Sequence, residues 1–233
     1  MVDSVNKNWR SRAASIESAA LAGLAHAGLL AASLALIQLD RPPLSAGDDV
    51  LTAFLSSPDA RARLVIAMNL TPLSVIAFLW FIAVIRRRVG DREDKFFSTV
   101  FLGSGLVLAA LLLVGSAVHG ATAVLATQTD RVPDPDAYRL MRSVGQGILG
   151  IAAPRLGAVF ILATSNLGRR TGALPRWLVA FGALAGIVMV VDVTFSEPMP
   201  FVFPVWVALV SLALLFRKPT GVANEGSQPS DDI

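Results

Sequence analysis

The longest apolar run in this chain extends from Phe96 to Thr129 without a single Asp, Glu, Lys or Arg. A helix needs only about 20 residues to cross the hydrocarbon core of a bilayer. The run therefore predicts a spanning helix that is either strongly tilted or continues past the hydrocarbon near His119. The whole chain agrees, because 54% of its residues are hydrophobic and 16% are charged, against about a quarter charged in a soluble domain. We expect an all-α integral membrane protein.

Five further apolar segments complete a predicted bundle of six transmembrane helices. They cover residues 18–39, 64–85, 143–166, 175–195 and 199–216. The first follows a basic stretch, as the core of a signal peptide does. It is longer than the roughly 7–15 apolar residues of such a core, and no small-x-small cleavage site ends it. We therefore interpret it as a retained span. Residues 1–216 then form a single transmembrane domain. The polar residues 217–233 are predicted to be a disordered cytoplasmic tail.

Basic residues predict the orientation of these spans. With six crossings, the N-terminus, the second and fourth connections and the tail lie on one side, and they hold 13 of the 20 Lys and Arg residues. The opposite side holds 6, and Arg155 lies inside the fourth span. Because cytoplasmic connections carry the excess of Lys and Arg, we expect a plasma-membrane protein with both termini in the cytoplasm. These Lys and Arg residues lie beside apolar segments. We therefore expect the partner of this basic chain to be the lipid bilayer and not nucleic acid.

Arg155 and Asp192 are the two charges placed well inside the predicted spans. An arginine at the centre of a span costs about 2.5–3.5 kcal/mol on the insertion scale, so each charge is expected to need a partner. The two side chains lean toward each other from antiparallel helices, and we predict that they meet, with His119 nearby. Arg155, Asp192 and His119 are therefore the candidate binding residues. Two interpretations stay open: an ion pair that locks two helices, and a binding or ion-relay site that opens outward.

The residues that usually carry catalysis in membranes are not arranged for it. His26 and His119 are predicted to differ in depth by roughly 20 Å, too far to ligate one haem. Ser104 is expected near one membrane face and His119 near the other, so a serine nucleophile and its base cannot meet. The chain has no cysteine, which excludes thiolate catalysis and thiolate metal sites. We expect no enzymatic activity, no cofactor and no metal.

Local patterns predict how the helices pack. Small residues at every fourth position follow one face of the first span, and Gly182 and Gly186 form a close-packing pair in the fifth. Pro72 should bend the second span, because proline removes a backbone hydrogen bond inside a helix. Asn69 should face protein rather than lipid, because its amide would otherwise be unsatisfied in hydrocarbon.

The connection between the fourth and fifth spans has the sequence Arg170-Thr171-Gly172-Ala173-Leu174-Pro175-Arg176-Trp177-Leu178. The last span contains Phe203-Pro204-Val205-Trp206-Val207. These two segments resemble a loose group of uncharacterised bacterial multi-span membrane proteins that share an Arg-Thr-Gly-x-Leu-Pro-Arg-Trp-Leu loop. The resemblance covers mainly the C-terminal third of the chain. It implies a helical bundle in the plasma membrane, with no activity to carry over.

These patterns favour a non-enzymatic multi-pass membrane protein that acts through helix packing or as a subunit beside a partner. The partner is another membrane protein or a second copy of the chain. The alternative is a small transporter or channel-like carrier that uses Arg155 and Asp192. A transporter needs a polar cavity that reaches both charges, whereas a structural pair lies in a dry bundle.

Overall fold

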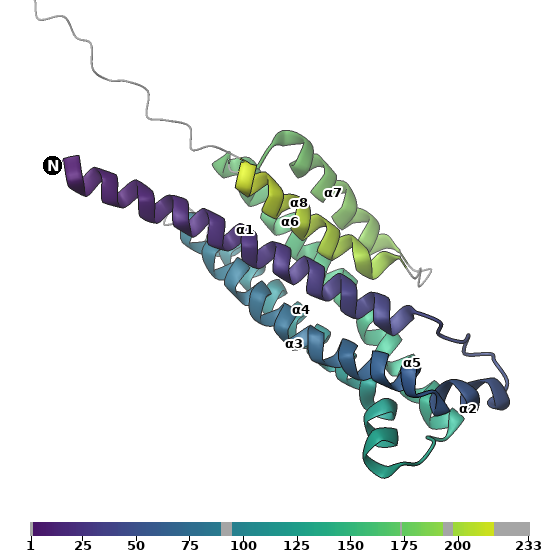
Figure 1. Cartoon of the computed structure of the whole chain (residues 1–233). Coiled ribbons are helices and arrows are strands. Elements are labelled where there is room, and N and C mark those ends of the chain that lie inside the picture. Colours follow the sequence, from purple (N-terminus) through teal and green to yellow (C-terminus); the bar gives the residue numbers. More distant parts are fainter. Residues whose placement is uncertain (1, 90–94, 173, 193–197, 217–233) are drawn as a thin grey trace, which may run out of the picture.

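The computed structural model describes residues 2–89, 95–172, 174–192 and 198–216 (Figure 1). Every regular element in these residues is a helix, so the predicted all-α class is confirmed. In chain order the elements are α1 (Val2–Gln38), α2 (Asp48–Ser56), α3 (Pro58–Val89), α4 (Lys95–Thr129), α5 (Pro135–Gln146), the π-helical segment η2 (Gly147–Ala152), α6 (Ala153–Thr171), α7 (Arg176–Val191) and α8 (Met199–Phe216). The predicted tail, residues 217–233, lies outside the described residues.

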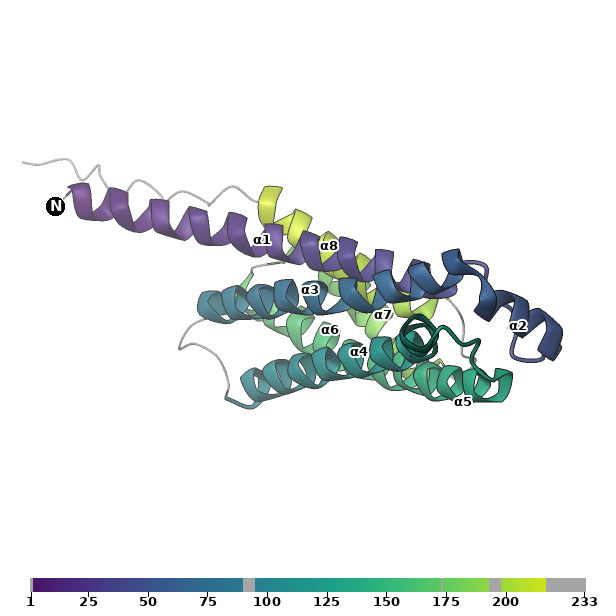
Figure 2. The same ribbon diagram turned by 60° about the horizontal axis from the view of Figure 1, so that its bottom comes forward.

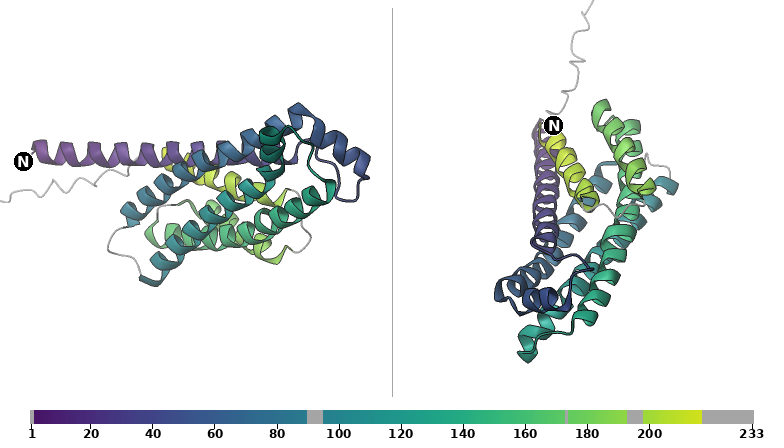
Figure 3. Two further views of the ribbon diagram at one scale, coloured as in Figure 1. Left: turned by 90° about the horizontal axis from the view of Figure 1, so that it is seen from below. Right: turned by 90° about the vertical axis from the view of Figure 1, so that its right-hand side faces the viewer.

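The long helices lie side by side in one bundle. α1 contacts α3 and α8, α3 contacts α4, α4 contacts α6, and α7 contacts mainly α6. One end of the bundle carries α2, α5 and the connections beside them, and we call it the cap end (Figures 1 and 2). The opposite end holds the start of α1, the Gly172 turn and the end of α8, and we call it the turn end. Two further views show α2 and α5 together at the cap end (Figure 3).

α5, η2 and α6 follow one another without a break from the cap end to the turn end. The first turn is capped by Asp134, whose carboxylate accepts a hydrogen bond from the Asp136 amide at 2.7 Å. The π-helical turn lies just before Pro154, and the Ala153 amide bonds the Ile148 carbonyl five residues back. A wider turn at this point gives room to the proline ring, which clashes with the preceding carbonyls of a regular α-helix.

Within the residues that the structure describes, five helical segments are long and apolar enough to cross a membrane. They cover Ala20–Gln38, Pro58–Arg86, Ser98–Thr129, Pro135–Arg170 and Met199–Phe216. The fifth predicted span is shorter than expected, because α7 ends at Val191 and Asp192 already has an extended backbone (φ −62°, ψ 116°). With 16 residues, α7 is roughly 24 Å long, against roughly 30 Å of hydrocarbon. The prediction of six full-length spans is therefore corrected to five long segments and one short apolar helix.

Aromatic rings fill the centre of the bundle. Phe78 of α3 lies against His26 of α1 (ring centroids 4.6 Å apart), Phe160 of α6 (5.2 Å) and Phe203 of α8 (5.6 Å). All four side chains are buried. Offset and edge-to-face arrangements are favourable for such rings. One aromatic side chain from each of four helices therefore stabilises the packing of the bundle.

The glycine pair in α7 allows the close approach that its spacing predicts. A side chain at Gly182 would collide with the Ser165 hydroxyl of α6, and a Cβ at Gly186 would lie 2.7 Å from Cγ of Leu162. In α1, a Cβ at Gly23 would lie 2.8 Å from the ring of Phe81. Small residues thus let neighbouring helix backbones pack closely where apolar contact alone provides little driving force.

The turn between α6 and α7 follows from its residues. Gly172 has φ +66°, a left-handed conformation that glycine adopts without a steric penalty. The Leu174 amide bonds the Gly168 carbonyl at 3.3 Å, which satisfies a carbonyl at the end of α6. Pro175 then precedes α7, and Trp177 is 58% exposed, as an interfacial anchor requires.

Asn69 does not face protein, so that prediction is wrong. Its side chain is exposed on α3, and its amide donates to the Val65 carbonyl at 2.8 Å. A hydrogen bond within its own helix removes the unsatisfied amide on which the prediction rested. α3 continues through Pro72 as one helix, and the bend there stays a prediction.

Candidate functional site

Arg155 meets Asp192 through the main chain. The Arg155 guanidinium donates from Nη1 to the Ile151 carbonyl of its own helix (2.9 Å) and from Nη2 to the backbone carbonyl of Asp192 (3.2 Å). Both hydrogen bonds are partly buried. Asp192 is the residue that ends α7, so this contact joins α6 to the C-terminal end of α7.

The geometry around Arg155 is that of a helix cap. The last carbonyls of a helix have no donors within the helix, and this end carries a partial negative charge. A guanidinium placed there supplies both a donor and a positive charge. Arg155 and Asp192 lie at a similar level, because Arg155 is 17 residues before Gly172 and Asp192 is 16 residues after Arg176, where α7 begins, or roughly 24–26 Å along each helix.

His119 lies away from this pair. Its ring is buried against Gly145 near the end of α5, where any side chain at Gly145 would collide with it. Its Nδ1 is 2.9 Å from the Gly115 carbonyl, one turn back on α4. Gly145 precedes Arg155 by about ten residues, roughly 15 Å toward the cap end. The structure therefore brings Arg155 and Asp192 together and does not bring His119 to them.

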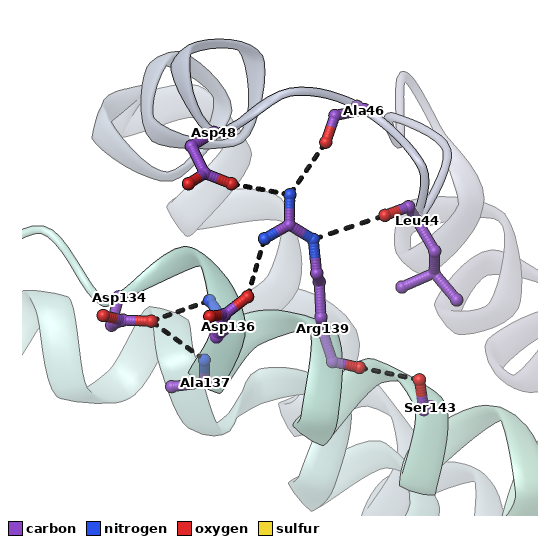
Figure 4. Close-up of polar contacts among 8 residues, drawn as sticks. All are labelled: Leu44, Ala46, Asp48, Asp134, Asp136, Ala137, Arg139 and Ser143. Atoms are coloured by element: carbon purple, nitrogen blue, oxygen red, sulfur yellow. Dashed lines mark hydrogen bonds and ion pairs between the residues drawn. The ribbon is translucent and has the colours of Figure 1, made fainter.

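Arg139 of α5 is the centre of a polar cluster at the cap end (Figure 4). Its guanidinium forms ion pairs with Asp48 (2.7 Å) and Asp136 (2.8 Å) and donates to the carbonyls of Leu44 (3.3 Å) and Ala46 (2.8 Å). Arginine suits this position because its planar group carries five donors in a fixed fork. One side chain thus fastens the connection after α1, and the start of α2, to α5.

A second layer of the cap lies under Arg139. Leu51 and Leu55 of α2 are buried and pack with Tyr138 of α5. Arg142 is only 7% exposed, which is unusual for a charged side chain. Its Nη1 donates to the Pro42 carbonyl, and it also shares a hydrogen bond with Tyr138. The cap is therefore held by apolar packing and by two arginines of α5.

From the sequence, Arg139 and Arg142 are orientation signals only, and their contacts are not predicted. Asp134, Pro135 and Asp136 predict a helix start that leads into the fourth span at Ser143, and the structure confirms it, because α5 begins at Pro135 and continues into the span. The available signal is spacing, because Tyr138 and Arg142 lie four residues apart and so share one helix face. Only the fold shows that this face meets the connection after α1.

Polar side chains also join α1 to α3. His26 Nδ1 lies 2.8 Å from Ser74 Oγ, and Ser74 Oγ donates to the His26 carbonyl at 3.1 Å. Further along, Ser33 Oγ lies 2.9 Å from Thr71 Oγ1. These side chains are buried. Hydrogen bonds of this kind between helices fix their relative position in apolar surroundings.

A small cavity lies in the middle of the bundle. It has about 20 Å³ of room for a water-sized sphere, about enough for one water molecule. Every residue that lines it is apolar, including Leu30 of α1, Leu149 of η2, Met189 of α7 and Phe203 of α8. Neither Arg155 nor Asp192 lines this cavity. It therefore provides no polar path to that pair.

Removing the charge of Arg139 is expected to loosen the cap while the bundle stays folded. An Arg139→Gln variant loses both ion pairs, so amide hydrogens of residues 41–52 should exchange faster. High salt screens the same ion pairs, so it should also speed this exchange in the unmodified protein. Arg131→Gln, which changes an exposed arginine at the same end, is the matched control. Hydrogen exchange followed by mass spectrometry checks this expectation. Equal exchange in the two variants would show that Arg139 does not hold the cap.

Two polar assemblies therefore stand out, the Arg155 contact at the end of α7 and the cap around Arg139. Among the residues that the structure describes, no group of three or more His, Cys, Asp or Glu side chains is placed to hold a metal ion. Comparisons of this chain with protein-family models, curated proteins and solved structures give no match.

Proposed function

We propose that this chain is a non-enzymatic multi-pass protein of the plasma membrane that acts through helix packing, as a subunit beside another membrane protein or a second copy of itself. The Arg155 contact carries the proposal. Its guanidinium donates to the backbone carbonyls of Ile151 and Asp192, so the cation inside the bundle binds the C-terminal end of α7. The resemblance of residues 170–178 to bacterial multi-span proteins supports the same location.

A small transporter or channel-like carrier that uses Arg155 and Asp192 is the second candidate. The partly buried guanidinium within an apolar hairpin favours it, because charges at such positions often mark ion or substrate paths. Aromatic rings in the bundle centre and the apolar cavity beside Phe203 favour the first candidate instead. Both observations place apolar side chains at the centre of the bundle, as a structural role requires.

Mild extraction followed by native mass spectrometry tests the proposed role. The 24.6 kDa chain should appear within a larger complex, either with a different protein or with a second copy. A chain that is monomeric at every detergent concentration would contradict a role as a subunit. Ion flux into proteoliposomes above that of empty liposomes would favour the second candidate.

Reporter fusions are expected to place the two ends of the bundle on opposite sides of the membrane. A fusion at residue 220 should lie in the cytoplasm and one within residues 40–63 outside, because the turn end is associated with 13 basic residues and the cap end with 6. Alkaline phosphatase, active outside, and green fluorescent protein, fluorescent inside, report the two locations. An external C-terminus would contradict the orientation.

A further inference from the structure

The cap end contains a second group of polar residues, separate from the contacts of Arg139. His119 and Thr122 come from α4, Tyr138 and Arg142 from α5, and Arg41 from the connection after α1; we call these five residues the cap cluster. Four of them are between 4% and 8% exposed, and Arg41 is partly exposed. Two neighbouring helices and the distant connection after α1 thus place polar groups at the cap end, four of them buried and Arg41 partly exposed.

Two positive charges act on the centre of the cap cluster. The guanidinium groups of Arg41 and Arg142 both act electrostatically on the His119 ring and on the Tyr138 phenol. Arg142 donates to the Pro42 carbonyl, which draws the connection after α1 onto α5. Both guanidinium groups therefore contribute positive potential at this site, which favours a bound anion.

Thr122 supplies an independent observation. Its Oγ1 is buried without a hydrogen-bond partner among the described residues. Thr127 and Thr129 on the same helix instead donate to carbonyls four residues back, at 2.8 Å each. Thr122 lies three residues after His119, so it lies on the face of α4 that packs against α5. Buried hydroxyl groups are almost always hydrogen-bonded, so the Thr122 hydroxyl is available as a donor to a group bound beside it, as is the buried Nε of Arg142.

The cap cluster also lies at the level of lipid headgroups, a step that rests on the proposed membrane insertion. Trp177 is exposed beside the Gly172 turn, where an indole is favoured at the membrane interface. Arg155 lies roughly 24 Å from that turn, and His119 lies roughly 15 Å further along the same axis. The cluster is thus roughly 39 Å from the first interface, beyond about 30 Å of hydrocarbon and within the 40–45 Å or so that includes headgroups.

We propose that the cap cluster binds a phosphate group. Arg41 and Arg142 supply charged donors in the planar arrangement that matches phosphate oxygens, and Thr122 supplies a neutral hydroxyl donor. A phosphate oxyanion has enough acceptor oxygens for all of them. The group belongs either to a phospholipid headgroup at the membrane surface or to a free phosphate in solution, and both present the same chemistry to the site.

The test uses the full chain purified in dodecyl maltoside, which contains no phosphate, and follows thermal unfolding by tryptophan fluorescence. Inorganic phosphate is titrated against chloride at constant ionic strength in one arm. Phosphatidylglycerol is titrated into the micelles in the other arm, with diacylglycerol as the lipid without phosphate. A ligand of the folded state raises Tm with the logarithm of its concentration above Kd. Stabilisation in either arm, or in both, identifies the source of the phosphate group, and stabilisation in neither overturns the site.

Two substitutions separate this site from general electrostatic binding. Without ligand, Thr122→Val should leave Tm unchanged or raise it, because a methyl group replaces an unpartnered buried hydroxyl. With ligand, Thr122→Val should weaken binding several-fold and Arg41→Gln about tenfold, the loss of one charge-assisted hydrogen bond. Arg131→Gln, at an exposed arginine of the same end, should bind as the unmodified protein does.

Equal stabilisation of the unmodified protein and both site variants would overturn the cap cluster as the binding site. This outcome is independent of the proposed function, because the reporter fusions measure membrane insertion and native mass spectrometry measures association. A correctly inserted protein that gains no stability from phosphate or phosphatidylglycerol would refute the phosphate site alone.

Discussion

Replacing Phe78 with alanine is expected to lower the free energy of unfolding by about 3–5 kcal/mol. Phe78 is fully buried, and its ring packs against His26, Phe160 and Phe203 from three other helices. Apolar side chains gain little when they move from lipid into a protein interior, so van der Waals packing carries much of the helix association. The cavity left by Phe78→Ala removes contacts among four helices at once.

Leu79→Ala is the matched control for this experiment. Leu79 follows Phe78 on the same helix but is 39% exposed, so its truncation should cost about 0.5 kcal/mol or less. Unfolding in mixed micelles of dodecyl maltoside and sodium dodecyl sulfate measures both variants under one set of conditions. Equal losses for Phe78→Ala and Leu79→Ala would show that the aromatic centre does not hold the bundle.

Arg155→Leu is expected to destabilise the protein by about 1–3 kcal/mol. The change removes the donors to the Ile151 and Asp192 carbonyls and the positive charge at the C-terminal end of α7. Leucine itself is tolerated in an apolar helix, so the loss measures the cap and not a clash. Thermal unfolding of the purified protein, compared with the same variant of Arg169 at the exposed end of α6, determines it.

Two conservative variants separate a main-chain cap from a side-chain ion pair. Asp192→Asn keeps the backbone carbonyl that Arg155 binds, so it should cost less than Arg155→Leu. Arg155→Lys keeps the charge but has a single ammonium group for two carbonyls, so its stability should be intermediate. Equal losses for Asp192→Asn and Arg155→Leu, with no further loss when they are combined, would instead establish an ion pair of the two side chains.

The helical class and several helix ends could be predicted from the sequence because they depend on neighbouring residues. An apolar run such as Phe96–Thr129 is expected to lie in lipid. Lipid offers no hydrogen-bond partners to the backbone, so the run forms a helix, which satisfies its own backbone groups. Gly172 and Pro175 predicted the turn between α6 and α7, since one permits a left-handed residue and the other starts a helix. The prediction for Asn69 is wrong because its amide donates to a carbonyl of its own helix.

The length of α7 could not be predicted in this way. Residues 175–195 form one uninterrupted apolar run apart from Arg176 and Asp192, and nothing in their periodicity ends a helix at Val191. The Arg155 guanidinium meets the chain at Asp192, where the helix has already ended. That contact depends on how α6 and α7 pack, so it is a property of the pair of helices and not of either segment.

The sequence by itself determined an all-α chain with apolar helices of spanning length, because hydrophobic runs and helix-ending residues act locally. The tertiary structure alone decided which charges meet. Arg139 reaches Asp48 across 91 positions of the chain, and His119 packs against Gly145 of α5 instead of lying beside Arg155. Such contacts depend on the order, tilt and overlap of packed helices, and a hydrophobic pattern repeated every few residues carries no information about these quantities.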